Sequence, residues 1–340
     1  MNPRELVKKL DDLRQNLDAQ LQLIMMGEDA VDPLIAFLLS APMLHPQPRC
    51  LAAEALGAIG GQKAIDGLIR ALTVNDVRDR DPTIRLAEEV VRNRAAEQLG
   101  RLGDCRAVEP LLEALARFHL VGAGEALAKL EEARAIPPMI ERLEDPFSRE
   151  RIGNALLTFG QEVQGALIET LSVKRLFRGE EARGSRERRA EAARLLGVLK
   201  SQKATDPLLE LLDDGAPEVR LQAALALCDL LKTDDHRIEG ALAVLVRDLE
   251  CGELATRDRV FDALVKMASR ALPHLFQVLE DPDLPDDAKL RAIEVLAHTS
   301  DPRVPGALLS LLSRPNRTLH WKARWALQRL GRTLEPYCPL

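Results

Sequence analysis

Aromatic residues are scarce in this sequence, and their scarcity excludes one class of binding surface. The 340 residues include only 7 Phe, 2 Trp and 1 Tyr, which is 3% of the chain. Proteins that hold bases or sugars by stacking need several exposed rings along one surface. Most of the 46% hydrophobic content is instead Leu, Ala, Val and Ile. An aromatic stacking platform is therefore not expected.

Long apolar runs and alternating strand patterns are also missing. No window approaches the roughly 20 uncharged apolar residues that cross a bilayer, and the N-terminus has no signal-like apolar run. We therefore predict a cytoplasmic protein with no membrane association. Few segments alternate apolar and polar residues, whereas the helix formers Ala, Leu, Glu and Arg dominate. The sequence predicts an all-α fold.

Paired cysteines are absent as well. The cysteines are widely spaced and form no CxxC motif; they are Cys50, Cys105, Cys228, Cys251 and Cys338. This pattern indicates reduced thiols rather than a disulfide scaffold or a zinc cluster.

What the sequence does contain is an internal repeat. A small or β-branched residue, then Pro or Gly, then an apolar stretch recurs, as in AVDPLIAFLL, AVEPLLEAL and ATDPLLELL. The Pro or Gly falls at Pro33, Gly67, Pro110, Pro138, Gly165, Pro207, Gly240, Pro273 and Gly306. Because the first-turn amides of a helix have no intrahelical acceptor, Pro is tolerated there. This position therefore predicts a helix start in each unit.

A second helix is predicted after each opening helix, as in RCLAAEALGAIG and RRAEAARLLGVLK. Small residues at three- and four-residue spacing let neighbouring helices approach closely. We expect five glycines to cap these helices with positive φ: Gly57, Gly100, Gly160, Gly197 and Gly331. No such pair can bury its apolar face alone, so about nine pairs are predicted to stack into an α-solenoid.

These units resemble HEAT repeats, specifically the phycobilisome-lyase HEAT-like repeat. The most similar segments are LAAEALGAIGGQKAIDGLIRAL at 51–72 and AAEQLGRLGDCRAVEPLLEAL at 95–115. The resemblance covers 28–334 and implies a single solenoid over 1–340 with no internal domain boundary. It implies little about function, because the same repeat serves unrelated activities.

The two ends are predicted to cap the array. Residues 1–27 form an amphipathic N-terminal capping helix, with a coiled-coil dimer as the alternative; its apolar stripe is Leu6, Leu10, Leu13, Leu17, Leu21 and Ile24. At the other end, Trp321 and Trp325 lie one turn apart, and Tyr337 lies in a tail at 335–340. We expect these rings to cap the last helix pair.

One long interval between units contains a charged insertion at 173–194. Residues 174–194 hold eight basic residues and four glutamates, a net charge of +4 in a chain whose net charge is −6. Extra length in a repeat array maps to a surface loop, often on a functional face. Either these charges form solvated pairs on a helix face, or the segment binds a partner or phosphate. The candidate binding residues are Lys174, Arg175, Arg178, Arg183, Arg186 and Arg188.

A second basic series recurs once per unit, seven residues before a Leu of the second helix. Its members are Arg49, Arg92, Arg149, Arg189, Arg220, Arg257 and Lys289, with His320 at the equivalent place in the last unit. In the family this position commonly pairs with an acidic residue of the turn, and Asp213, Asp214 and Glu218 precede Arg220. We interpret the series as ordering the stack, with a ligand-facing groove as the alternative.

Some proteins with this repeat are enzymes, but the motifs that carry their activities are missing from this sequence. Deoxyhypusine hydroxylase binds two irons through repeated His-Glu pairs, but none of the six histidines here precedes a Glu. HEAT-like alkylpurine glycosylases need a dense basic footprint, which a pI near 5.7 does not favour. No nucleophile elbow or Gly-rich phosphate loop is present. We therefore predict no catalytic residue, no cofactor and no metal site.

The function that the sequence favours is a nonenzymatic protein-interaction scaffold. Solenoids suit this role because each repeat adds a similar patch to one extended surface, here the concave face. The expected partner is a protein, and nucleic acid is disfavoured. The alternatives are a phycobilin-lyase-like chromophore attachment factor and a HEAT-like DNA-binding protein or glycosylase.

Overall fold

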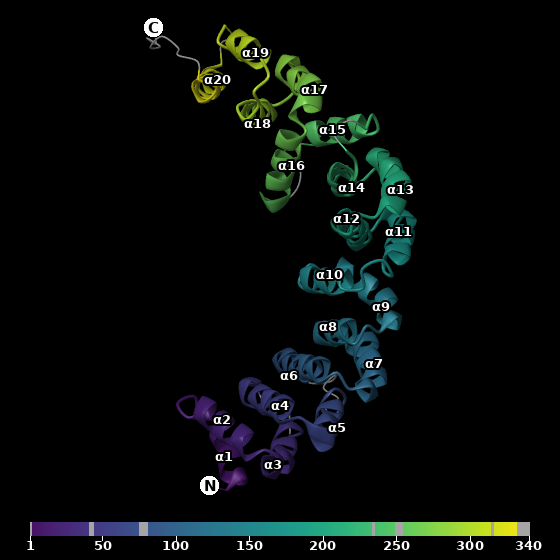
Figure 1. Ribbon diagram of the computed structural model, residues 1–340, viewed down its shortest axis with the longest axis vertical. Helices are drawn as coiled ribbons and strands as arrows, with labels where there is room; N and C mark the ends of the chain where they lie inside the picture. Colours follow the sequence, from purple (N-terminus) through teal and green to yellow (C-terminus); the bar gives the residue numbers. More distant parts are fainter. Residues whose placement is uncertain are drawn as a thin grey trace. The chain divides into compact units, whose positions relative to one another are not determined.

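The computed structural model describes residues 2–40, 44–74, 81–232, 235–248, 254–313 and 316–331. Within these ranges the chain forms α-helices, short 3-10 helices and one two-stranded β-sheet. It divides into two compact units, Met1–Ala166 and Leu167–Leu340. In both, the helices alternate between two rows, which confirms the predicted α-solenoid fold (Figure 1).

The first unit begins with two helices and continues with four helix pairs. The leading helices are α1 (Pro3–Lys9) and α2 (Asn16–Met26). The first helices of the pairs are α3 (Glu28–Leu38), α5 (Gly61–Ala71), α7 (Val108–Phe118) and α9 (Ile136–Glu141). The second helices are α4 (Gln47–Ile59), α6 (Pro82–Leu102), α8 (Val121–Lys129) and α10 (Arg149–Leu157). The 3-10 helices are η1 (Cys105–Ala107), η2 (Ala133–Ala135) and η3 (Arg142–Glu144). Helices α2, α4, α6, α8 and α10 contact one another in that order and make one row (Figure 1).

The second unit repeats this arrangement. Helix α11 (Gln164–Ser172) contains the boundary between the units. The other first helices are α13 (Thr205–Glu210), α15 (Ile238–Arg247), α17 (Ala268–Glu280) and α19 (Val304–Leu311). The second helices are α12 (Arg183–Val198), α14 (Pro217–Leu230), α16 (Leu254–Lys266), α18 (Asp286–Leu296) and α20 (Arg317–Arg329). Two 3-10 helices, η4 (Gln202–Ala204) and η5 (Leu211–Asp213), flank α13. Strands β1 (Leu176–Phe177) and β2 (Glu180–Glu181) precede α12.

The core lies between the two rows and is built of small and branched apolar side chains. In α14, for example, Val219, Ala223, Ala226 and Leu227 are completely buried. Apolar burial at this density is the main favourable term for a repeat that has no separate core. The scarcity of rings in the sequence therefore matches a core made by closely stacked helices.

The recurring Pro or Gly is the second or third residue of its helix in six units, and it lies farther inside the helix at Pro33, Gly67 and Pro273. Pro110, Pro138 and Pro207 are each the third residue of their helix. Pro33 and Pro273 lie farther inside α3 and α17. The difference arises because a 3-10 helix (η1, η2 or η4) forms the first turn before α7, α9 and α13. In α3 and α17 the corresponding residues already belong to the α-helix.

Three of the five glycines predicted as helix caps are not caps. Gly160 and Gly331 have positive φ, as expected. Gly57, Gly100 and Gly197 instead lie inside α4, α6 and α12. A Cβ on Gly100 would lie 2.7 Å from Ala126 Cα of α8, and one on Gly197 would lie 2.9 Å from Ala226 Cα of α14. These two glycines are needed for close helix approach, which the sequence pattern alone did not distinguish from capping.

The predicted single capping helix over 1–27 is wrong, because the structure has two helices there. The Asp12 side chain accepts a hydrogen bond from the backbone N–H of Arg14, and a turn at 10–15 separates α1 from α2. Consequently the six apolar residues do not share one buried stripe. Leu6 and Leu10 are buried, whereas Leu13, Leu17 and Leu21 are at least 60% exposed.

At the other end, α20 carries both tryptophans. Trp321 is 67% exposed. The Lys322 ammonium and the Arg329 guanidinium lie over the Trp325 ring at 4.4 and 5.8 Å. Tyr337 and the predicted tail at 335–340 lie outside the described residues.

Candidate functional site

The charged insertion of the second unit folds into a β-hairpin that leads into α12. Leu176 pairs with Glu181 and Phe177 with Glu180 in antiparallel register. The turn residues Arg178 and Gly179 have φ of 54° and 89°. Two successive positive φ values are typical of the two-residue turns that match the twist of a hairpin.

Hydrogen bonds fix the hairpin to the start of α12. The Ala182 amide donates to the carbonyl of Arg175 at 2.8 Å. The buried Ser185 hydroxyl accepts from the Arg175 amide at 3.0 Å and donates to Glu181 at 2.8 Å. The hairpin is therefore held at its base while its tip extends into solvent.

The hairpin exposes apolar and cationic side chains together. Val173, Leu176 and Phe177 are 50%, 67% and 66% exposed. The Arg178 guanidinium lies 5.2 Å from the centre of the Phe177 ring. Lys174, Arg175 and Arg183 are also exposed. Large apolar groups exposed beside arginines are typical of surfaces that bind proteins.

The structure brings most of the predicted binding residues to this surface, with one exception. Lys174, Arg175, Arg178 and Arg183 are exposed, and Arg186 is partly exposed and pairs with Glu218 at 3.5 Å. Arg188 is only 2% exposed and donates to the carbonyl of Val173 at 3.3 Å. Arg188 is therefore not part of the binding surface, because it lies on the inward face of α12.

A buried ion-pair cluster supports the hairpin from below. Arg189, 1% exposed, donates to the carbonyl of Leu171 at 2.7 Å and contacts Glu181 at 3.0 Å and Asp214 at 2.6 Å. Lys174 reaches the same Asp214 carboxylate at 3.0 Å. Burial alone would raise the pKa of Asp214, but hydrogen bonds from Arg189, the Ala216 amide and Lys174 lower it to about 2. Asp214 is therefore ionised at neutral pH.

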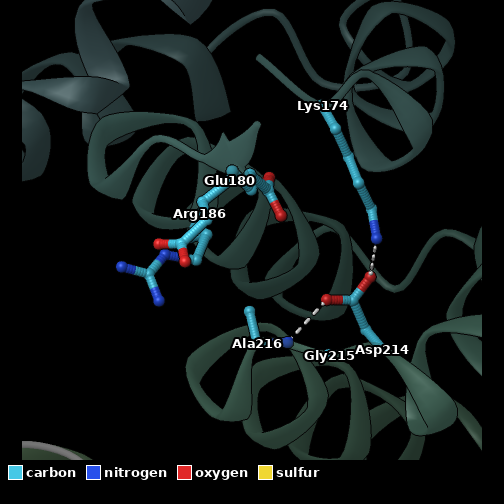
Figure 2. Close-up of a pocket in the computed structure, with 7 residues that line it drawn as sticks. Lys174, Glu180, Arg186, Asp214, Gly215 and Ala216 are labelled. Carbon is cyan, nitrogen blue, oxygen red and sulfur yellow. Dashed lines mark hydrogen bonds and ion pairs between the residues drawn. The ribbon is translucent and has the colours of Figure 1, made fainter. Parts of the chain in front are cut away.

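A hollow of about 280 Å³ lies beside this cluster (Figure 2). Its lining residues are Lys174, Glu180, Glu181, Arg186, Asp214, Gly215 and Ala216. Figure 2 shows Lys174 and the Ala216 amide both bonded to Asp214, with Arg186 extending away from it. A wall of both charge signs suits a polar peptide segment better than a polyanion.

The arginines of the once-per-unit series share a backbone contact. Arg49, Arg149, Arg189 and Arg220 each donate to a carbonyl at the end of the preceding first-helix segment. These carbonyls belong to Leu38 at 2.8 Å, Leu143 at 2.9 Å, Leu171 at 2.7 Å and Asp214 at 2.8 Å. The contact satisfies carbonyls that a helix end leaves without an intrahelical partner.

Three of these guanidinium groups also reach a carboxylate in the following unit. Arg49 contacts Glu88 at 2.5 Å, and Arg189 contacts Asp214 at 2.6 Å. Arg220 contacts Asp248 at 3.3 Å, so its carboxylate lies in the next turn and not among the acidic residues that precede it. The Arg220 guanidinium therefore bridges the carbonyl of Asp214 in its own turn and the Asp248 carboxylate of the following unit.

The remaining members of the series have other surroundings. The Arg92 guanidinium lies 4.0 Å over the Phe118 ring at the end of α7, so a ring takes the place of the carboxylate. Lys289 is buried, 6% exposed. Arg257 lines a hollow of about 190 Å³ with Phe261, Arg291 and other residues of α16 and α18.

A second series of ion pairs, on the row of first helices, was missed in the sequence. The acidic residue just before the Pro or Gly position pairs with a basic residue of the next unit. The pairs are Lys63–Asp32 at 3.4 Å, Arg106–Asp66 at 2.8 Å, Arg134–Glu109 at 2.7 Å, Arg237–Asp206 at 4.0 Å and Arg270–Glu239 at 2.9 Å. The recurring Asp/Glu-x-Arg tripeptides at 104–106, 132–134 and 235–237 were the available signal.

The row of second helices in the first unit carries alternating charges. Arg94 contacts Glu54 of α4 at 3.2 Å and Glu97 at 2.8 Å. Arg151 of α10 contacts Glu97 at 3.1 Å and Glu125 of α8 at 2.6 Å. These bonds link four helices, and the hydrogen bonds and charges of Glu125 and Glu97 raise the pKa of Arg151. The surface is mixed in sign and is not a continuous positive groove.

The described residues provide neither a metal-binding cluster nor a membrane-spanning helix. Among the described residues, no three His, Cys, Asp or Glu side chains are grouped so that they could hold a metal ion. None of the helices in the described ranges has the length and apolarity needed to traverse a membrane. Cys50 and Cys228 are buried thiols, Cys105 is exposed, and burial raises the pKa of Cys50 to about 11.

Two family models match the sequence. Residues 180–264 match HEAT repeats, and residues 48–73 and 91–117 match the PBS lyase HEAT-like repeat. These segments of the chain are HEAT repeats. No curated protein sequence matches it.

Solved structures similar to this chain have varied functions. Karyopherin Kap121p bound to Pho4p is 12% identical, with 97% of this chain and 45% of that chain covered and a TM-score of 0.52. Human deoxyhypusine hydroxylase in complex with glycerol is 20% identical, with coverage of 90% and 98% and a TM-score of 0.30. The CpcE–CpcF complex of phycocyanin lyase from Nostoc sp. PCC7120 is 24% identical, with coverage of 72% and 93% and a TM-score of 0.35. At these identities the likeness concerns the fold alone.

Proposed function

We propose that this chain is a nonenzymatic protein-interaction scaffold and that the hairpin at 173–183 is one of its docking elements. The observation that carries the proposal is the exposure of Leu176 and Phe177 next to Arg178 on a hairpin that is fixed at its base. A pre-formed element loses little conformational freedom when it binds, so more of the contact energy contributes to affinity.

The charge pattern supports a protein partner over nucleic acid. Duplex binding depends on a dense array of cations along the phosphates. The row of second helices in the first unit instead alternates Arg94 and Arg151 with three glutamates. The hollow beside the hairpin likewise contains Glu180, Glu181 and Asp214.

The hairpin also specifies the chemistry of its partner. Its exposed basic residues are Lys174, Arg175, Arg178 and Arg183, of which Lys174 is paired with Asp214 and Arg183 with Glu187. The charge of Arg178 beside the Phe177 ring favours an acidic segment that carries an apolar side chain. We expect binding to weaken as salt rises, because exposed charge pairs are screened.

The test is affinity capture with the full chain, followed by quantitative identification of the retained proteins. The hairpin variant is Phe177→Ser with Arg178→Ser, and the matched control is Phe147→Ser, which alters a 95% exposed ring in the first unit. We expect a specific protein to be retained by the wild type and the control and lost at least about tenfold in the hairpin variant. Equal capture by all three proteins, or turnover of a substrate in an unbiased metabolite screen without specific capture, would contradict the proposal.

A second candidate function is chromophore attachment, which the matches at 48–73 and 91–117 to the PBS lyase HEAT-like repeat favour. The repeat itself does not supply this activity, since one fold serves several functions. Mixing the chain with phycocyanobilin tests it directly. A shift in visible absorbance would favour this function, and an unchanged spectrum would exclude it.

A further inference from the structure

Helix α2 exposes an apolar stripe in the first unit. Leu13, Leu17, Leu21 and Met25 are 84%, 64%, 60% and 87% exposed, and they recur every four residues. Leu13 lies in the helical turn that leads into α2, where the Asn16 amide donates to the carbonyl of Asp12. At 3.6 residues per turn, residues four apart lie on one face.

The opposite face of α2 is already occupied. Ala19 and Leu23 are buried, and the Gln20 amide donates to the carbonyl of Leu51 and to Glu54, both of α4. Residues 19 and 23 lie about 200° from Leu21 around the helix. The stripe therefore lies on the side of α2 opposite the buried Ala19 and Leu23.

The place of α2 in the array makes this stripe unusual. Helices α4, α6 and α8 each contact two second-row helices, whereas within the described residues α2 packs against one, α4 (Figure 1). Apolar side chains exposed together on one helix face are typical of an interaction surface.

We infer that this stripe pairs antiparallel with the same stripe of a second copy of the chain. The part of the stripe that lies within α2 is symmetrical about Leu21, with Leu17 and Met25 one turn away on either side; Leu13 lies outside this symmetric part. A two-fold axis at Leu21 places Leu21 against Leu21 and Leu17 against Met25, which is the self-complementary arrangement of a two-fold dimer.

The charges nearest the stripe favour the antiparallel direction, while Asp11 and Asp12 lie just beyond it. The exposed Arg14 lies at the N-terminal end of the stripe, and the exposed Glu28 and Asp29 follow its C-terminal end. Antiparallel pairing brings Arg14 of one copy toward the carboxylates of the other. Parallel pairing would place like charges together, which is unfavourable.

The first experiment measures the mass of the full chain by sedimentation at concentrations up to about 100 μM. We expect twice the 37.6 kDa monomer mass for the wild type. Leu17→Lys with Leu21→Lys weakens association at least about tenfold, because it places charges at the centre of the interface. Phe147→Lys, which alters an exposed ring outside α2, leaves association unchanged. Circular dichroism checks that helicity is retained; both leucines are exposed, so folding does not depend on them.

The second experiment tests the direction of pairing by oxidative crosslinking. Leu21→Cys produces more disulfide-linked dimer than the wild type, because residue 21 meets itself across the axis. Leu17→Cys alone does not, because residue 17 meets residue 25. A monomeric wild type, a dimer that survives the double Lys variant, or equal crosslinking of both Cys variants would overturn the inference.

Discussion

Arg49 shows how one side chain joins two neighbouring units. It is 1% exposed, and its Nε donates to the carbonyl of Leu38 while its terminal nitrogens contact the fully buried Glu88. Burying two charges is costly, and mutual hydrogen bonds offset that cost only while both partners are present. The free energy of unfolding therefore falls far more when one partner is removed than when both are replaced by apolar residues.

We predict that Arg49→Met destabilises the chain by about 3–5 kcal/mol, since it leaves the buried Glu88 carboxylate without its partner. Arg49→Met combined with Glu88→Leu recovers most of this loss. Urea unfolding followed by circular dichroism measures both. The control is Lys63→Met, which breaks an exposed pair with Asp32 and costs less than about 1 kcal/mol. Equal losses for Arg49→Met and Lys63→Met would show that burial does not determine the effect.

The ionisation of Asp214 predicts how the stability of the fold changes at acid pH. Its pKa is lowered from 3.8 to about 2, so its ionised form stabilises the fold above about pH 4 and this contribution is lost as pH falls toward 2. Asp214→Asn removes the charge, so the variant is less stable than the wild type by about 1–2 kcal/mol near neutral pH. The difference shrinks between pH 4 and pH 2. Thermal unfolding of both proteins across this range measures it, and a difference that is constant with pH would contradict the prediction.

At the scale of the helix, glycines without side chains let two neighbouring helices pack backbone against backbone. Alanine normally stabilises a helix by up to about 1 kcal/mol relative to glycine. At Gly197 the added Cβ would meet the backbone of α14 at 2.9 Å, a contact that requires the helices to separate. Alanine at position 197 is therefore expected to destabilise the protein rather than stabilise it.

We predict that Gly197→Ala lowers the free energy of unfolding by about 1–3 kcal/mol, because it overpacks the contact between α12 and α14. The thermal midpoint falls with it. Gly165→Ala is the matched control: Gly165 also lies in a helix, α11, but a Cβ there meets nothing within 4 Å. The control should be neutral or slightly stabilising. Differential scanning calorimetry compares them, and a stabilised Gly197→Ala protein would refute close approach at this position.

For the hairpin, the sequence pattern located the charged segment but could not predict which of its side chains are buried. The charged segment was recognised by its length and composition, but Arg188, one of its predicted binding residues, is buried. Its side chain faces inward because of its position around α12, and that position depends on where the hairpin ends and the helix begins. The pair Arg178-Gly179 was the local signal for the turn.

For the whole molecule, stability should be local rather than uniform. In a repeat array each unit contacts only its neighbours, so a weakened contact affects nearby units most. We predict that Gly100→Ala, which overpacks α6 against α8, lowers amide hydrogen-exchange protection in those helices and leaves α18 unchanged. Mass spectrometry of exchanged peptides measures this in the full chain. A uniform loss of protection would indicate a single cooperative unit instead.

The fold was predictable because one signal recurs many times. The Pro or Gly position and the small-residue stripe of the second helices identified the helix pairs even though individual boundaries differed. The N-terminal region occurs once and has no such redundancy, so the spacing of its leucines predicted one helix where Asp12 and its turn produce two. The partners of the buried arginines could not be predicted either, because they lie in the next unit, as far away in sequence as Glu88 is from Arg49.

The pairing of charges between adjacent units also bears on how such a chain can change its length. Arg49, Arg189 and Arg220 each find a carboxylate in the following unit, and the first-helix pairs also cross from one unit to the next. Duplicating or deleting a complete unit at these boundaries would therefore keep the charges compatible. Arg92 is different, since its neighbour presents the Phe118 ring in place of a carboxylate. The two sides of the Arg92 junction must therefore be inherited together, because recombination there would place a carboxylate-binding position against a ring.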